Sequence, residues 1–271
     1  MKLHKKIGAV AAALALAMSL TACGGEDTGA TDDKIVIGIK FDQPGLGQKV
    51  GDGYQGFDVE VAKYVAKELG YAEDKIEFKE SPSAQRENLI MGGQVKLIFA
   101  TYSITDARKE KVSFAGPYFI AGQDLLVKQD STIAGTNDLS GKKLCSVTGS
   151  TSATKVKEKV PGVQLQEFDT YSKCVDALAN GSIDAVTTDD VILAGFAAQD
   201  AYKGKLKVVG APFSEERYGV GLKKGDTELC TKVNTAIKKM IDSGDWAKAI
   251  EKTVGPSGYK VPAAPTQDAC S

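Results

Sequence analysis

Short apolar runs alternate along the chain with longer segments in which apolar residues recur every third or fourth position. The run at residues 35–39 is typical of a buried strand, and the spacing in residues 57–69 predicts an amphipathic helix. Between them, the glycine-rich stretch 42–56 is expected to be a flexible loop. Further strands are expected at residues 76–78, 95–101, 143–147, 163–168, 183–187, 206–209 and 218–222, and helices at 83–93, 151–159, 171–180, 191–199, 226–241 and around Trp246.

This alternation of strands and helices predicts an α/β fold in two lobes, each with a parallel sheet. Because the pattern restarts midway, a second unit is expected to be inserted between two parts of the first. Lobe 1 would comprise residues 34–125 and 212–271, and lobe 2 residues 126–211. Two hinge crossings, near 123–127 and 209–214, would join them. Ligands bind outside the carboxyl ends of such strands, so the expected site is a cleft between the lobes.

The amino-terminal segment has the layout of a secretory signal peptide. Residues 1–22 combine a basic start, an apolar run from Ile7 to Leu20 and small residues before Cys23. The apolar run is shorter than the roughly 20 residues that span a bilayer. The Leu-Thr-Ala-Cys sequence resembles a bacterial lipobox, which implies cleavage before Cys23 and lipidation, with palmitate, of its thiol. Residues 23–33 would then form a lipid-anchored flexible tether at the extracytoplasmic face of the bacterial cell membrane.

Charge and histidine content exclude several classes of function. Without residues 1–22, the chain has 31 basic and 35 acidic residues, which argues against a nucleic-acid partner. The only histidine is His4, which would leave with the signal peptide. The remaining chain therefore lacks the histidine needed for Ser-His-Asp or Cys-His catalysis and for imidazole-ligated zinc. We expect no cofactor and no metal.

Four cysteines remain besides Cys23, and none of them forms a C-x-x-C pair. An even number in an exported protein predicts two disulfides, for which three connectivities are possible. We favour Cys145 with Cys174 and Cys230 with Cys270, because each pair then lies within one region of the chain.

Three segments together resemble the polar-amino-acid-binding proteins of ABC uptake systems. They are Gly56 to Ala62, Ala100 to Arg108 and Phe114 to Phe119, and the resemblance extends over residues 34–254. It implies a two-lobed periplasmic-binding-protein type II fold whose lobes close on a ligand by hinge motion. It also implies delivery to an ABC permease with a cytoplasmic ATPase, and a monomeric protein that is not an enzyme.

The resemblance also implies the residues that hold an amino acid at its α-carbon. Arg108 matches the arginine that clamps the α-carboxylate, a role suited to a planar guanidinium. Asp189 matches the aspartate that receives the α-ammonium. The remaining matched positions are Thr101 and Ser103 at the end of a strand, and Thr148, Ser150 and Thr151 in a turn before a helix, whose free N–H groups favour anions.

Specificity is expected from the opposite end of the cleft. Arg86 matches an arginine typical of the acidic-ligand members of the family, and those members carry a cation at the position of Lys40, which ends the first strand. The resemblance thus implies two cations against the ligand side chain. A neutral side chain would leave these charges uncompensated, so we expect glutamate first and aspartate second. Phe41, Gln43 and Tyr102 are candidates to pack the aliphatic part of the ligand. A binder of glutamine or of polar amino acids in general is the alternative, and a dehydratase-like enzyme on the same fold is a weaker one.

Overall fold

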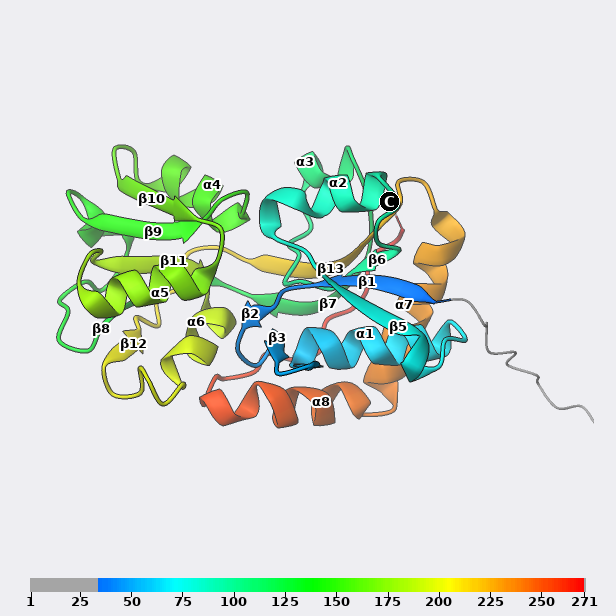
Figure 1. Cartoon of the computed structure of the whole chain (residues 1–271). Coiled ribbons are helices and arrows are strands. Elements are labelled where there is room, and N and C mark those ends of the chain that lie inside the picture. Colours follow the sequence, from blue (N-terminus) through cyan, green and yellow to red (C-terminus); the bar gives the residue numbers. More distant parts are fainter. Residues whose placement is uncertain (1–33, 271) are drawn as a thin grey trace, which may run out of the picture.

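The computed structural model describes residues 34–270. The predicted signal peptide, the cysteine expected to carry lipid (Cys23) and the predicted tether lie outside the described residues. Within residues 34–270 the chain forms two five-stranded sheets, each covered by helices, which lie beside one another as two lobes (Figure 1). The predicted two-lobed α/β architecture is therefore confirmed.

The sheet of lobe 1 has the strand order β5-β1-β6-β13-β7. Strands β1, β5 and β6 are parallel, whereas β13 runs antiparallel to both β6 and β7. Helices α1, α7 and α8 pack together on one side of this sheet, and the short helices α2 and α3 lie on the other (Figure 1). The strands are β1 (Ile35–Ile39), β5 (Ile76–Glu80), β6 (Leu97–Ile98), β7 (Ser113–Ala121) and β13 (Glu216–Leu222), and the helices α1 (Phe57–Glu68), α2 (Arg86–Met91), α3 (Asp106–Lys109), α7 (Thr227–Asp242) and α8 (Asp245–Thr253).

The sheet of lobe 2 has the order β10-β9-β11-β8-β12. Strands β9, β10 and β11 are parallel, and β8 runs antiparallel to both β11 and β12. Three helices pack against this sheet. The strands are β8 (Gln123–Lys128), β9 (Lys143–Val147), β10 (Gln164–Phe168), β11 (Ala185–Asp189) and β12 (Leu206–Val208), and the helices α4 (Thr151–Lys159), α5 (Tyr171–Asn180) and α6 (Asp190–Ala197).

Three local expectations were wrong. The sheets are mixed rather than parallel, because the long strands around the crossings join them in the antiparallel sense. The glycine-rich stretch 42–56 is not a loop throughout but a small antiparallel sheet of β2 (Asp42–Gln43), β3 (Gly47–Val50) and β4 (Gly53–Gln55). The helix expected from Ser83 begins at Arg86, after a 3-10 turn that contains Ser83.

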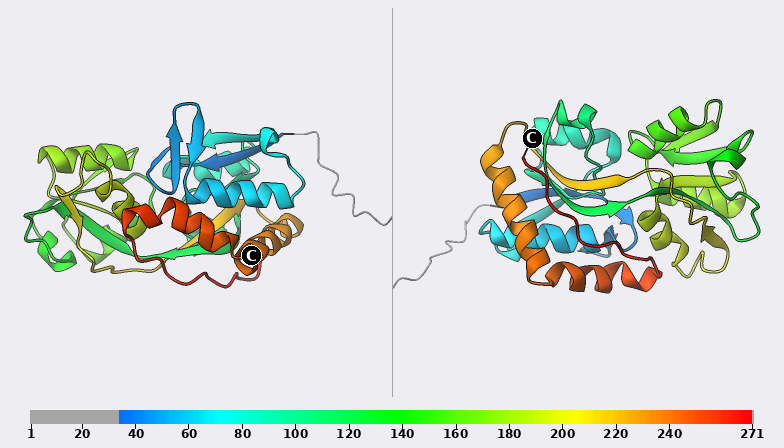
Figure 2. Two further views of the ribbon diagram at one scale, coloured as in Figure 1. Left: turned by 90° about the horizontal axis from the view of Figure 1, so that it is seen from below. Right: turned by 180° about the vertical axis from the view of Figure 1, so that it is seen from behind.

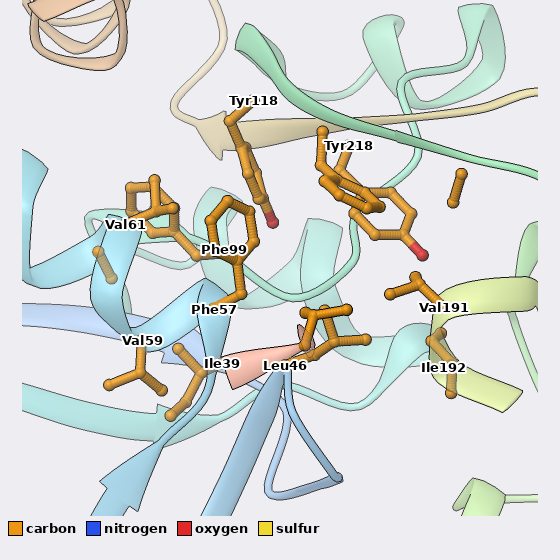
Figure 3. Packing of buried hydrophobic residues seen from close by; sticks show 14 of the residues in the cluster. Ile39, Leu46, Phe57, Val59, Val61, Phe99, Tyr118, Val191, Ile192 and Tyr218 are labelled. Atoms are coloured by element: carbon orange, nitrogen blue, oxygen red, sulfur yellow. The ribbon is translucent and has the colours of Figure 1, made fainter. Parts of the chain in front are cut away.

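The chain crosses between the lobes twice. Gly122 separates β7, in the sheet of lobe 1, from β8, in the sheet of lobe 2, and the return crossing lies between β12 and β13. The apolar core continues across this junction. Val191 and Ile192 of α6 face Leu46 and Tyr218 of lobe 1 (Figure 3). The described structure is therefore one in which the lobes are closed against each other.

Both favoured disulfides are confirmed. Cys145 is bonded to Cys174 within lobe 2, and Cys230 of α7 is bonded to Cys270 near the carboxyl terminus. After α8 the chain runs back across β7 and β13 to reach α7 (Figure 2). Asp268 holds this segment in place, because its N–H donates to the Gly116 carbonyl over 2.7 Å.

Candidate functional site

A small cavity lies between the lobes, at the carboxyl ends of the central strands. It leaves about 10 Å³ for the centre of a water-sized sphere, which is room for about one water molecule. Both lobes contribute to its wall. Lobe 1 supplies Ser83, Arg86, Thr101 and Arg108, and lobe 2 supplies Ser150, Thr151, Ser152, Tyr171, Thr188, Asp189 and Ile192.

Arg108 is placed in this cavity by the short helix α3. The Thr105 side chain caps that helix by accepting a hydrogen bond from the Arg108 N–H. The guanidinium donates to the Ser103 carbonyl over 2.8 Å and, across the cleft, to the Gly149 carbonyl over 3.3 Å. Its Nε lies 3.3 Å from a carboxylate oxygen of Glu87. Arg108 therefore already joins the two lobes.

Arg86 is a second buried cation beside Arg108. Both guanidinium groups lie against the Tyr102 ring, at 5.1 Å for Arg86 and 4.8 Å for Arg108. Burial, and then the charge of Arg108, lower the pKa of Arg86. Among residues 34–270, the one hydrogen bond of the Arg86 side chain is from Nε to the Ser81 carbonyl. Its two terminal nitrogens are thus available to a ligand anion.

Thr101 lines the cavity in a conformation that few residues other than glycine adopt, with φ of 46°. Its N–H donates to one carboxylate oxygen of Asp58 over 2.9 Å, and the Tyr118 hydroxyl donates to the other over 2.7 Å. Burial raises the pKa of Asp58 from 3.8 to about 6. Asp58 occurs in the resemblance motif but was given no role from the sequence. In the structure it fixes the backbone of a cavity residue.

Lobe 2 contributes the amino-terminal end of helix α4. The Ser150 side chain caps this helix by accepting from the Ala153 N–H over 3.0 Å. The N–H groups of Thr151 and Ser152 open the helix and have no partner within it, so this end favours an anion. Thr151 and Ser103 contact across the cleft, with 3.4 Å between their hydroxyl oxygens.

Asp189 contributes a carboxyl group to the cavity wall. It ends β11 and precedes α6, and its carboxylate accepts a 2.6 Å hydrogen bond from the Tyr218 hydroxyl. The Ser152 hydroxyl donates to its other oxygen over 3.5 Å. Burial, and then the negative charge of Glu216, raise the pKa of Asp189 well above its usual range. A ligand cation would relieve this cost by restoring a charge partner.

Several residues predicted for the site do not line the cavity. Tyr102 lies behind the two arginines, where its ring packs on Phe114. Lys40 is buried beside Asp42, and Gln43 is buried, where its side-chain oxygen accepts from the Thr101 hydroxyl. Three further predicted residues also lie outside the lining: Ser103, whose carbonyl holds Arg108, the exposed Thr148, and Phe41, which packs on Tyr54.

Five cavity residues were not predicted: Ser83, Ser152, Tyr171, Thr188 and Ile192. Two of them could have been found from the predicted elements. Tyr171 begins the helix that follows β10, so it lies at the carboxyl end of a parallel strand. Ser152 is the second residue of a helix whose start was already predicted to bind an anion. These two residues could have been predicted from their positions at the ends of elements, because a tyrosine or a serine alone does not indicate a binding site.

Two α/β lobes that enclose a buried site of paired charges define a type II periplasmic-binding fold. The chain belongs to the bacterial extracellular solute-binding proteins, family 3, whose sequence pattern matches residues 35–256. Within the described part of the chain, none of the helices combines the length and apolar character needed to cross a bilayer. The same residues hold no cluster of three or more His, Cys, Asp or Glu side chains suited to a metal ion.

Several proteins similar in sequence to this chain are named for the amino acid that they bind. The chain is 46% identical to the glutamate-binding protein GluB of Corynebacterium glutamicum, in a match that covers 92% of this chain and 90% of the relative. It is 38% identical to the ABC transporter glutamine-binding protein GlnH of Bacillus subtilis, with 82% of each chain covered. A solved ancestral arginine-binding protein bound to glutamine is 35% identical and superposes with a TM-score of 0.76, covering 83% of this chain and 99% of that one.

Proposed function

We propose that this protein captures glutamate outside the cell membrane and delivers it to an ABC permease. The observation that carries the proposal is the charge of the cavity wall, which contains the cations Arg86 and Arg108 and the anion Asp189. Glutamate carries two carboxylates and one ammonium, so its charges match these three groups one for one. Glutamine lacks the second carboxylate and would leave a buried arginine uncompensated.

Each end of the ligand has a defined partner in this proposal. Arg108 and the amino-terminal end of α4 would hold the α-carboxylate, and Asp189 would receive the ammonium. The terminal nitrogens of Arg86 would bind the side-chain carboxylate. The 46% identity to a glutamate-binding protein supports this assignment.

Capture requires the lobes to separate and close, because the cavity of the closed structure has room for about one water molecule. The crossings at Gly122 and between β12 and β13 are the places where the chain would bend. The permease would recognise the closed form of the protein. We further propose that the protein acts as a monomer without catalysis, held at the membrane by lipid on Cys23, which raises its effective concentration near the permease.

Isothermal titration of the purified protein with glutamate, aspartate, glutamine and asparagine tests the proposal. Glutamate should bind most tightly. Arg86→Gln should lose roughly 2–5 kcal/mol of glutamate affinity and much less of glutamine affinity. Arg108→Ala should lose affinity for all four amino acids.

Arg217→Gln is a matched control, because Arg217 is paired with Asp268 away from the cavity. It should bind as the parent does. Tighter binding of glutamine than of glutamate by the parent protein would refute the assignment of the ligand. An Arg108→Ala variant with parental glutamate affinity would refute the site.

A further inference from the structure

Asp42 of lobe 1 contacts the first turn of helix α5 in lobe 2. One oxygen of its carboxylate accepts from the Tyr171 N–H over 2.9 Å and from the Ser172 N–H over 3.3 Å. The Ser172 hydroxyl lies 3.4 Å from the same oxygen. Asp42 is not part of the cavity wall, so this contact joins the lobes at a place outside the cavity.

The amino-terminal end of α5 suits a carboxylate. The first N–H groups of a helix have no partner within it, and the helix dipole makes this end positive. Thr170 of the same lobe already caps the third N–H, that of Lys173. Asp42 satisfies the first two, and it does so from the other lobe. These N–H groups lose this partner whenever the lobes separate.

Lys40 holds the Asp42 side chain from within lobe 1. Its ammonium nitrogen lies 3.1 Å from the second carboxylate oxygen of Asp42, and its side chain is fully buried. Neither of these two atoms has a hydrogen bond of good geometry within residues 34–270, so the pair is held by charge. Lys40 therefore fixes the orientation of the Asp42 carboxylate toward α5.

We propose that Asp42 is a positioning residue that stabilises the closed form and, by holding the Tyr171 backbone, fixes one wall of the ligand cavity. Tyr171 is buried and lines that cavity. Lys40 acts through Asp42 rather than on the ligand. The inference rests on the proposed function, because it assigns a role in the capture of the same ligand.

Apparent affinity depends on the fraction of protein that can close. Hydrogen bonds to a charged group are stronger than those between neutral groups. Loss of this contact should therefore lower the affinity roughly tenfold to hundredfold. Since Asp42 does not touch the ligand, the loss should be equal for glutamate and glutamine. It should appear in the dissociation rate, because the contact forms only after the lobes meet.

The test compares Asp42→Asn, Asp42→Ala and Lys40→Met in the full chain, by titration and stopped-flow binding of glutamate and glutamine. All three should dissociate faster with an unchanged preference between the two ligands. Asp42→Asn has nearly the shape of the parent side chain and keeps the test valid if the alanine variant misfolds. Asp52→Asn is the matched control, because Asp52 is exposed in the same small sheet region.

Parental dissociation rates in Asp42→Asn would overturn the inference. The inference would also be overturned if Lys40→Met lost the preference for glutamate while Asp42→Asn kept that preference. Lys40 would then contact the ligand directly. Failure of the proposed function has a different signature. In that case the parent, or Arg86→Gln, gives the wrong ligand preference, whatever the Asp42 variants do.

Discussion

Gly149→Ala should prevent full closure of the lobes while leaving each lobe intact. Gly149 lies in lobe 2, in the turn between β9 and α4, and its φ of +77° is in the left-handed region. A Cβ atom at this position would lie 2.7–2.9 Å from the backbone Cα and N and from the Cβ of Ala84 in lobe 1. Ordinary contacts between carbon atoms are about 3.5–4.0 Å. The two lobes would therefore have to separate by about 1 Å at this point.

The expected cost has two parts. Alanine in the left-handed region costs roughly 1–2 kcal/mol in the open and the closed form alike, so this part reduces stability but not ligand affinity. The overlap with Ala84 exists in the closed form alone, and overpacking of this kind costs roughly 1–3 kcal/mol. The affinity for glutamate should fall by about fivefold to 150-fold.

Gly162→Ala provides the matched control. Gly162 is in the same lobe and has a φ of +81°, but a Cβ there would meet nothing within 4 Å. Both variants should show a similar loss of thermal stability, and only Gly149→Ala should show a raised dissociation constant by titration. Small-angle X-ray scattering with saturating glutamate should give a larger radius of gyration for Gly149→Ala. Equal glutamate affinity in the two variants would refute the argument.

Three further outcomes are expected. Gly195→Ala should favour helix α6 by about 1 kcal/mol, yet weaken glutamate binding in titration, because its Cβ would overlap the Pro44 carbonyl of lobe 1. Because burial raises the pKa of Asp58 to about 6, its protonation stabilises the folded state. The free energy of unfolding of the parent relative to Asp58→Asn should therefore rise by roughly 2–3 kcal/mol between about pH 7 and pH 4, as denaturant titrations would show. Cys270→Ser opens the disulfide to α7 and should cost roughly 2–4 kcal/mol in the same titrations, without a change in ligand preference.

Apolar periodicity located most of the elements, because most of them are long enough to show it. The strand at residues 143–147 and the helices at 151–159 and 171–180 have the predicted bounds. The strand β7 was not predicted, and it contains Pro117, a residue that cannot donate to a sheet hydrogen bond. Proline is tolerated there because β7 lies at the edge of its sheet. The strands within residues 42–56 have two to four residues, too few to show an alternation.

The position of Lys40 was the part of the site that sequence reasoning placed least well. A cation at the end of a strand was expected to point into the cleft, but Asp42, two residues later, pairs with it. Lys40 follows β1 and Asp42 begins β2 only two residues later, so a local ion pair could have been considered. The contact of Asp42 with α5 could not, because it depends on how far the two lobes close.

The cations near the cleft differ in how far the protein itself already compensates them. Arg108 is paired with Glu87, and Lys40 lies beside Asp42. Arg86 is buried with a single hydrogen bond, to a backbone carbonyl, within the described residues. A ligand carboxylate therefore gains most at Arg86, because it replaces no existing anion there. Discrimination between glutamate and glutamine should accordingly depend on Arg86, while Lys40 and Asp42 determine how long either ligand stays bound.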